Sequence, residues 1–169
     1  MTEWPHEDTA SLNRFYGDPR GENGAVSPRW EMENLVAWTP AFPMFYSDGR
    51  HTPLKTLRVH KKCLPAFEGG FKAALEKLGH DYIVEHRLNI SGGSFCYRQE
   101  RGGSRLSVHS WGCAIDMDPG HNPFPHIWVP NHGFLDLQFV NIMREFGFYW
   151  RGDVVKRDID PMHLQLCVH

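Results

Sequence analysis

Apolar residues recur at three- and four-residue steps in two segments of the chain, which is the spacing of one buried helix face. The first predicted helix begins near Val59 or Pro65 and ends before Gly79, because glycine is typical of the position just past a helix. The second is predicted between Phe134 and Gly147. The two apolar faces consist of Leu64, Phe67, Phe71, Leu75 and Leu78, and of Phe134, Leu137, Val140 and Met143.

The segment before these helices shows no long periodic pattern. Residues 1–27 are rich in polar residues, glycine and proline, and we expect them to form an irregular wrap. Ser27 followed by Pro28 is typical of a helix start, so a short helix is predicted to run to about Val36. Prolines and a glycine interrupt any long element in 38–53.

Short runs of strand-forming residues dominate the second half of the chain. Ala114, Asp116 and Asp118 fall on one side of an alternating pattern, with apolar residues between them, as in a strand with one buried face. Strand runs mixed with two main helices indicate an α+β fold. Further strands are predicted at 82–90, 94–98, 148–150 and 162–168, with a strand-like stretch at 127–129 inside a loop.

The composition is that of a soluble globular protein and narrows the range of partners. Its 169 residues match one ordinary domain, and 41% hydrophobic with 22% charged residues is an average balance. The formal charge of -2 argues against a broad electrostatic grip on nucleic acid. No apolar run approaches the roughly 20 residues that cross a bilayer, and the acidic N-terminus is unlike a secretory signal peptide. We therefore expect a protein made in the cytoplasm without nucleic-acid or membrane partners.

Cysteine and histidine usage points to different roles. The cysteines form no C-x-x-C pair, so neither a thiolate zinc site nor a redox motif is indicated, and we expect reduced core residues. The 11 histidines are unusually many, and together with the abundant aromatic residues they favour a metal site or a carved pocket. The cysteines are Cys63, Cys96, Cys113 and Cys167.

The segment around His109 carries the pattern that points most directly to chemistry. We expect His109 to end one strand, the chain to turn at 111–112, and Asp116 to lie on the next strand. His163 would arrive from a distant strand. Two imidazoles and one carboxylate with one open position are the arrangement of catalytic zinc, which lowers the pKa of its water toward 7. Asp118 is the alternative carboxylate, or else it caps a turn.

Hydrolysis at such a site also needs a proton carrier and a fixed cation. Asp160 lies three residues before His163, and this spacing lets it reach the water while His163 holds the metal. Asp153 is the competing candidate for this role. Arg98 can present a bidentate fork to transition-state charge or to a substrate carboxylate, and otherwise forms a surface ion pair.

Other residues of these types leave alternatives open. Trp111 and Trp150 either wall a groove or belong to the core. Three histidines of one loop either hold a second metal ion or, as we expect, serve as surface or packing residues. These histidines are His121, His126 and His132.

The motifs resemble those of the M15 family of zinc D-alanyl-D-alanine carboxypeptidases and L-alanyl-D-glutamate endopeptidases, which includes VanX/VanY-like enzymes and many phage endolysins. Residues 107–116 match the signature S-x-H-x-x-G-x-A-x-D, and 160–163 resemble the closing acid-x-x-His motif. Tyr97-Arg98 resembles the upstream Y-R pair. Residues 58–62 look like the helix start that opens the phage and VanY-like branch.

The resemblance covers about residues 55–169 and implies a hedgehog/DD-peptidase-like α+β fold, with a central antiparallel sheet flanked by helices. Residues 1–169 would then form a single peptidase domain. Within it, 1–54 would be an irregular N-terminal wrap with a short helix, and 55–169 would be the catalytic core.

The resemblance also implies roles for the site residues. One Zn2+ would be the cofactor. Asp160 would act as general base and acid, Arg98 would bind and polarise the substrate, and Ser107 would line the pocket by hydrogen bonding. The implied zinc ligands are His109, Asp116 and His163.

The function implied is hydrolysis of an amide bond in peptidoglycan stem peptides by a monomer. The first expectation is a phage-type endolysin that cuts L-Ala-D-Glu and acts on the bacterial cell wall in the periplasm. The alternatives are a D-Ala-D-Ala carboxypeptidase and a non-catalytic zinc-binding module like that of hedgehog proteins. The chain departs from the relatives at Arg151 and Val154, in their W-G-G-x-W stretch, and at Gln165, where several have Glu.

Overall fold

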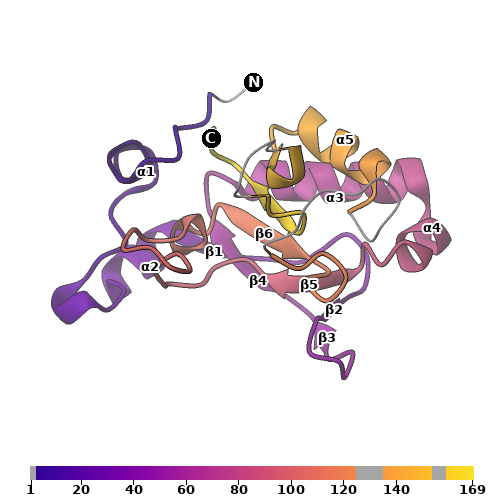
Figure 1. The fold of residues 1–169 in the computed structure, drawn as a ribbon, viewed down its shortest axis with the longest axis horizontal. Coiled ribbons are helices and arrows are strands. Elements are labelled where there is room, and N and C mark those ends of the chain that lie inside the picture. The colour runs from indigo at the N-terminus through magenta and orange to yellow at the C-terminus, as the bar shows by residue number, and fades with distance from the viewer. Residues whose placement is uncertain (1–2, 125–134, 154–158) are drawn as a thin grey trace.

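The computed structural model describes residues 3–124, 135–153 and 159–169, with the side chain of Asp153 left out. Within these residues the chain forms helices packed on β-structure (Figure 1). The α-helices are α1 (Thr9–Tyr16), α2 (Pro28–Asn34), α3 (Leu64–Leu78), α4 (His80–Glu85) and α5 (Leu137–Glu145). The strands are β1 (Leu35–Trp38), β2 (Met44–Tyr46), β3 (Pro53–Leu54), β4 (Leu57–His60), β5 (Ile90–Gly93), β6 (Ala114–Met117), β7 (Tyr149–Trp150) and β8 (His163–Gln165). Three short 3-10 helices are η1 (Glu22–Gly24), η2 (Val108–Trp111) and η3 (Arg151–Asp153).

The larger sheet has six strands in the order β3-β2-β5-β6-β8-β7. All neighbouring strands in it are antiparallel except β2 and β5, which run parallel. The sheet is therefore mixed, and the expectation of an antiparallel sheet is wrong in this respect. β1 and β4 form a separate antiparallel pair. In the larger sheet Asp116 on β6 lies directly opposite His163 on β8. The architecture is a mixture of helices and sheets that is compatible with the α+β class.

Helices α3 and α5 lie side by side on one face of the larger sheet (Figure 1). Phe71 of α3 and Phe139 of α5 are fully buried and meet edge to face, with ring centroids 5.7 Å apart. Each such side chain contributes about 1.5–3 kcal/mol through its burial. Gly70 allows the close approach of the two helices, because a Cβ there would lie 2.9 Å from Met143 Sδ.

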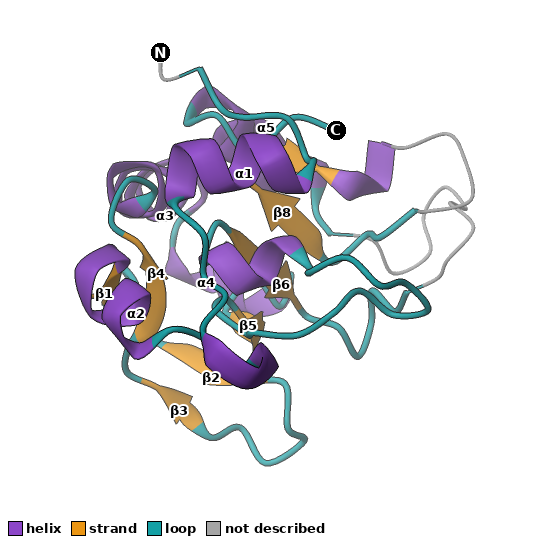
Figure 2. Ribbon diagram, turned by 90° about the vertical axis from the view of Figure 1, so that its left-hand side faces the viewer, coloured by secondary structure: helices purple, strands orange, loops and turns teal. Residues whose placement is uncertain are grey.

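The N-terminal segment is more ordered than the expected irregular wrap. Asp8 caps α1 by accepting a hydrogen bond from the backbone N–H of Ser11 at 2.9 Å, a helix start that the composition of residues 1–27 does not predict. The buried Tyr16 hydroxyl donates to the Leu166 carbonyl at 2.6 Å, and the Glu7 N–H donates to the Val168 carbonyl at 2.7 Å. These contacts hold the two ends of the chain on the same side of the molecule (Figure 2).

Several predicted helix boundaries are confirmed. Ser27 caps α2 through the N–H of Trp30, although α2 ends at Asn34, because the next residue already enters β1. The first long helix takes the later of its two predicted starts and is followed by Gly79 at φ +81°. The second long helix is closed by Gly147 at φ +90°.

Three predicted elements are wrong. Residues 82–85 complete α4, 86–89 form a turn, and only Ile90 enters β5, because the short helix α4 buries Ile83 alone rather than an alternating set of residues. Residues 58–62 lie mainly in β4 instead of starting a helix, since Leu57 and Val59 alternate into the core. Residues 94–98 form no strand. The predictions at 127–129 and Phe134 fall outside the described residues, as do His126 and His132.

The described helices include none that combines the length and apolar character needed to cross a membrane.

Candidate metal centre and its pocket

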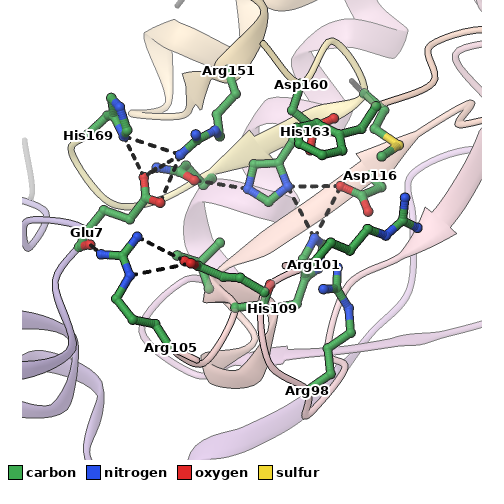
Figure 3. Close-up of a pocket in the computed structure, with 16 residues that line it drawn as sticks. Glu7, Arg98, Arg101, Arg105, His109, Asp116, Arg151, Asp160, His163 and His169 are labelled. Atoms are coloured by element: carbon green, nitrogen blue, oxygen red, sulfur yellow. Dashed lines mark hydrogen bonds and ion pairs between the residues drawn. The ribbon is translucent and has the colours of Figure 1, made fainter. Parts of the chain in front are cut away.

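Three side chains from separate elements meet at one point in a pocket (Figure 3). His109 lies in η2, Asp116 on β6 and His163 on β8. His109 Nε2 lies 3.2 Å from Asp116 Oδ1 and 3.2 Å from His163 Nδ1. His163 Nδ1 lies 2.9 Å from Asp116 Oδ1. The two predicted imidazoles and the predicted carboxylate are therefore brought together.

The hydrogen bonds behind the two rings determine what this cluster can hold. His109 Nδ1 lies 2.6 Å from the Ser94 carbonyl, which can only accept, so this nitrogen carries the proton. His163 Nε2 lies 3.0 Å from the side-chain oxygen of Gln165, which also only accepts. The facing atoms are therefore two imidazole lone pairs and a carboxylate oxygen.

Three lone-pair donors at this separation fit a metal cation. Ligands bound at about 2.0–2.1 Å in a tetrahedral site lie roughly 3.3 Å from one another. The cluster's ligand atoms all lie within 4.8 Å of one another, and they offer the nitrogen and oxygen donors that zinc accepts. In the described part of the chain this is the one such group of histidine, cysteine and acidic residues.

Burial and charge act together on the titrating groups of the cluster. Burial would raise the pKa of Asp116, but the neighbouring His109 and His163 hold that pKa well below its ordinary value. Burial would lower the pKa of His109, but the charge and hydrogen bond of the Asp116 carboxylate outweigh the effect of burial, so the pKa of His109 is raised. Asp116 is thus kept as a charged carboxylate that attracts positive charge to this point.

Asp160 lies beside His163 and begins a tight turn (Figure 3). The His163 N–H donates to the Asp160 carbonyl at 3.1 Å, and Pro161 occupies the second position of that turn, where its fixed φ is favoured. Burial raises the pKa of the Asp160 carboxyl. Its Oδ1 is buried without a hydrogen-bond partner among the described residues. A carboxyl in this state is suited to exchanging a proton.

Arginine side chains line the same pocket. Arg98 donates through its guanidinium to the Gln99 carbonyl and, among the described residues, pairs with no carboxylate. Arg101 also lines the pocket and forms no ion pair with a described residue. Ser107 is buried at the pocket wall, and its N–H donates to the Arg98 carbonyl at 3.0 Å. Both predicted substrate contacts, Arg98 and Ser107, thus lie at the pocket.

The alternative site residues that the sequence offered either have other roles or lie outside the described residues. Asp118 is not one of the clustered side chains and forms a bidentate pair with Arg87 at 2.6 and 3.0 Å. Trp111 is fully buried and belongs to the core. Trp150 is also buried and donates to the Pro161 carbonyl at 2.7 Å. The side chain of Asp153, the competing candidate for proton transfer, lies outside the described residues.

One local expectation about the site is wrong. His109 does not end a strand but lies in η2, whose last residue is followed by Gly112 in the left-handed region at φ +66°. A turn at 111–112 is predicted from the sequence. The 3-10 helix η2 is too short to leave a periodic pattern in the sequence, so it is not predicted. This turn directs the His109 ring toward β6 and β8.

Four further pocket residues were not predicted as site residues from the sequence. Glu7, Arg151 and His169 come from the N-terminal segment, η3 and the C-terminus, and Gln165 comes from β8. Arg151 Nη1 lies 2.8 Å from both Glu7 carboxylate oxygens. Arg151 and Gln165 stand out in the sequence as departures from the relatives. Nothing in the sequence indicates that either residue contacts Glu7.

The mixed α/β fold and this constellation define a class of protein, a mixed α/β domain whose buried His-Asp-His group could bind a metal ion. A comparison with protein families then gives a particular match. A family model described as D-alanyl-D-alanine carboxypeptidase, one of the M15 peptidases, matches residues 101–166. This match indicates a peptidase and supports the M15 family, and its span includes the three clustered residues and Asp160 but not Arg98. No curated protein and no solved structure matches the chain.

Proposed function

We propose that the protein is a zinc-dependent peptidase that hydrolyses an amide bond in the stem peptides of bacterial peptidoglycan. The observation that carries this proposal is the convergence of His109, Asp116 and His163, with two lone pairs and a carboxylate facing one another. The match to the M15 peptidases supports the peptide substrate. The hedgehog/DD-peptidase-like arrangement of the fold is part of the same proposal.

In this proposal His109, Asp116 and His163 hold the metal, and the other pocket residues handle the substrate and the proton. Zinc would supply Lewis-acid polarisation of the scissile carbonyl and acidification of a water molecule. Asp160 takes a proton from the attacking water and returns it to the leaving amine, so the proton count balances over one cycle. Its raised pKa suits the second of these two steps.

Arg98 and Ser107 are proposed to bind the substrate. The Arg98 guanidinium donates hydrogen bonds to the oxygen that gains negative charge, or to a free carboxylate of the substrate. The support is its place in the pocket lining and the absence of a described carboxylate partner. Ser107, buried beside His109, would hydrogen-bond the same substrate.

For the bond that is cleaved, we propose the one between L-Ala and D-Glu, as in phage-type endolysins, on the basis of the motif resemblance. The second candidate is removal of a terminal D-Ala, and the observation that favours it is the description of the matching family model as a D-alanyl-D-alanine carboxypeptidase. In either case we propose a monomer that acts on the bacterial cell wall.

The experiment is digestion of purified peptidoglycan, with mass spectrometry of the products. New N-terminal D-Glu is expected for the endopeptidase, whereas released D-Ala would establish the carboxypeptidase. A parallel sample stripped of metal by a chelator should lose hydrolysis and regain it on addition of Zn2+. Undiminished hydrolysis after stripping would refute the metal-dependent mechanism. A fully metallated sample that cleaves no wall peptide would instead favour the non-catalytic binding module.

A further inference from the structure

We propose that Glu7, which belongs to the N-terminal segment, is a positioning residue of the metal centre. It acts through the Gln165 amide, which in turn orients the His163 ring so that Nδ1 faces Asp116 and His109. This inference rests on the proposed metal site, but it does not depend on which peptide bond is cleaved.

The first step concerns the orientation of the Gln165 amide. Gln165 is fully buried, and its Nε2 lies 2.8 Å from Glu7 Oε2 and 3.1 Å from the Cys167 carbonyl oxygen. An amide nitrogen has two hydrogens, and both of these partners can only accept. If the amide group were flipped by 180°, its oxygen would face the Glu7 carboxylate oxygen and the Cys167 carbonyl oxygen, and none of the three could donate a hydrogen bond. Glu7 and the Cys167 carbonyl therefore fix which end of the amide faces His163.

The second step concerns the His163 ring. With the amide so fixed, Gln165 Oε1 lies 3.0 Å from His163 Nε2 and can only accept, so Nε2 carries the ring proton. The lone pair then resides on Nδ1, which is 2.9 Å from Asp116 Oδ1. A neutral ring with its lone pair on this nitrogen is the form that binds a metal ion.

The third step is that Glu7 is itself held firmly as a carboxylate. Its side chain is 10% exposed, and Arg151 Nη1 lies 2.8 Å from both of its oxygens. His169 Nδ1 lies 3.0 Å from Oε2 (Figure 3). Burial would raise the pKa of Glu7, but the hydrogen bond from Gln165 and the charge of Arg151 lower it. The backbone N–H of Glu7 also donates to the Val168 carbonyl, which fixes the segment beside the C-terminal residues that follow β8.

A merely structural role for Glu7, fastening the N-terminus to the C-terminus, is the alternative that the test must separate. Outer partners of metal-bound histidines typically change metal affinity about 10- to 100-fold when they are removed. A fastening role alone would lower thermal stability without altering the metal site. Zinc affinity and the geometry around a bound metal ion are therefore the decisive readouts.

The experiment measures the Zn2+ dissociation constant by competition with a chelator, and the visible spectrum with Co2+, for the full chain and four variants. Glu7→Leu removes the acceptor for Gln165, and Gln165→Met removes the acceptor for His163. Both should weaken Zn2+ binding about tenfold or more and change the Co2+ spectrum. Glu7→Gln keeps an oxygen that accepts from Gln165 and should retain affinity within about threefold.

Asp8→Ala is the matched control, because Asp8 is the next residue and anchors the same segment by capping α1. It should lower the melting temperature and leave the Zn2+ affinity and Co2+ spectrum of the wild type. Glu7→Leu with wild-type affinity and spectrum would overturn the inference. If Glu7→Leu does not fold, wild-type binding by Gln165→Met overturns it instead. A wild-type chain that binds no Zn2+ would overturn the metal site itself, which distinguishes the two failures.

Discussion

At the scale of single residues, the site depends on where two imidazole rings keep their protons. His109 donates from Nδ1 to the Ser94 carbonyl, and His163 donates from Nε2 to Gln165, so opposite ring nitrogens face the cluster. With either ring in the other tautomer, an N–H would point at the place where a cation must sit. Partners behind the rings thus matter as much as the ligand atoms themselves.

Asp160 gives the first prediction at this scale. Asp160→Asn keeps the shape of the side chain but removes the group that exchanges protons. We expect one Zn2+ per chain to remain and the turnover of peptidoglycan to fall about 10²- to 10⁴-fold. Metal analysis and product mass spectrometry on the same sample check both parts.

Asp153→Asn is the matched control, since Asp153 is the competing carboxylate. It should retain wild-type turnover. If Asp153→Asn is inactive while Asp160→Asn is active, the proton carrier is Asp153.

His60 gives a prediction about acid stability. Burial lowers its pKa from 6.5 to about 4, and both ring nitrogens are already used, by the Tyr16 carbonyl and the Lys62 N–H. Between pH 6.5 and pH 4 the unfolded chain takes up a proton that the folded chain refuses, so stability falls as the pH falls. The full effect is about 3 kcal/mol.

Urea unfolding at several pH values checks this prediction. His60→Gln should show a shallower loss of stability between pH 6.5 and pH 4 than the wild type. His80→Gln, at an exposed position, is the control and should follow the wild-type curve. Equal slopes for all three proteins would show that His60 does not cause the acid sensitivity.

At the scale of elements, the turns decide where the ligands point. Gly112 ends η2 at φ +66°, and a Cβ there would lie 2.9 Å from the backbone nitrogen of His60 in β4. The turn that carries His109 is thereby pressed against the β1-β4 pair. The glycine is required both for its left-handed backbone and for this close contact.

Gly112→Ala is therefore expected to destabilise the protein by more than the roughly 1–2 kcal/mol cost of a left-handed alanine. It should also weaken Zn2+ binding, because the turn that holds His109 must shift. Gly49→Ala is the matched control, since Gly49 has a similar φ of +70° but nothing within 4 Å of the added Cβ. Urea unfolding and Zn2+ titration of both variants check this, and equal losses of stability would contradict the contact.

At the scale of the whole molecule, the sheet brings together residues that are far apart in the chain. Asp116 and His163 are register partners on β6 and β8, and Glu7 reaches Gln165 across the joined chain ends. Metal binding should therefore stabilise the folded state as a whole, because the unfolded chain does not assemble this cluster.

Zn2+ at about 100 times its dissociation constant should add about 2.7 kcal/mol of stability. For a chain of this size that raises Tm by roughly 5–10 °C. A chelator should reverse the shift, and His163→Ala should show none because it lacks a ligand. Differential scanning calorimetry checks this, and the same Zn2+-induced shift in His163→Ala would exclude His163 as a ligand.

Local patterns in the sequence predict much of the fold. The helix around Phe67 and Phe71, the Ser27 cap and the glycines that follow both long helices were readable, because each rests on spacing or on a single backbone requirement. Residues 82–90 were misread, because their strand-like composition is overridden by a turn of helix that buries Ile83 alone. The sequence does not predict helix α1, because polar residues, glycines and prolines dominate residues 1–27 and favour an irregular segment.

The sequence by itself determined the residue types and spacing of the proposed ligands and of Asp160, since a donor's chemistry is a property of the side chain. Only the tertiary structure decided that these side chains meet, which ring nitrogen of His163 faces the cluster, and that Glu7 stands behind Gln165. The physical reason is that protonation and orientation are set by neighbours in space. The sheet register joins Asp116 to His163, 47 positions apart, and the packing of the two chain ends joins Glu7 to Gln165, 158 positions apart.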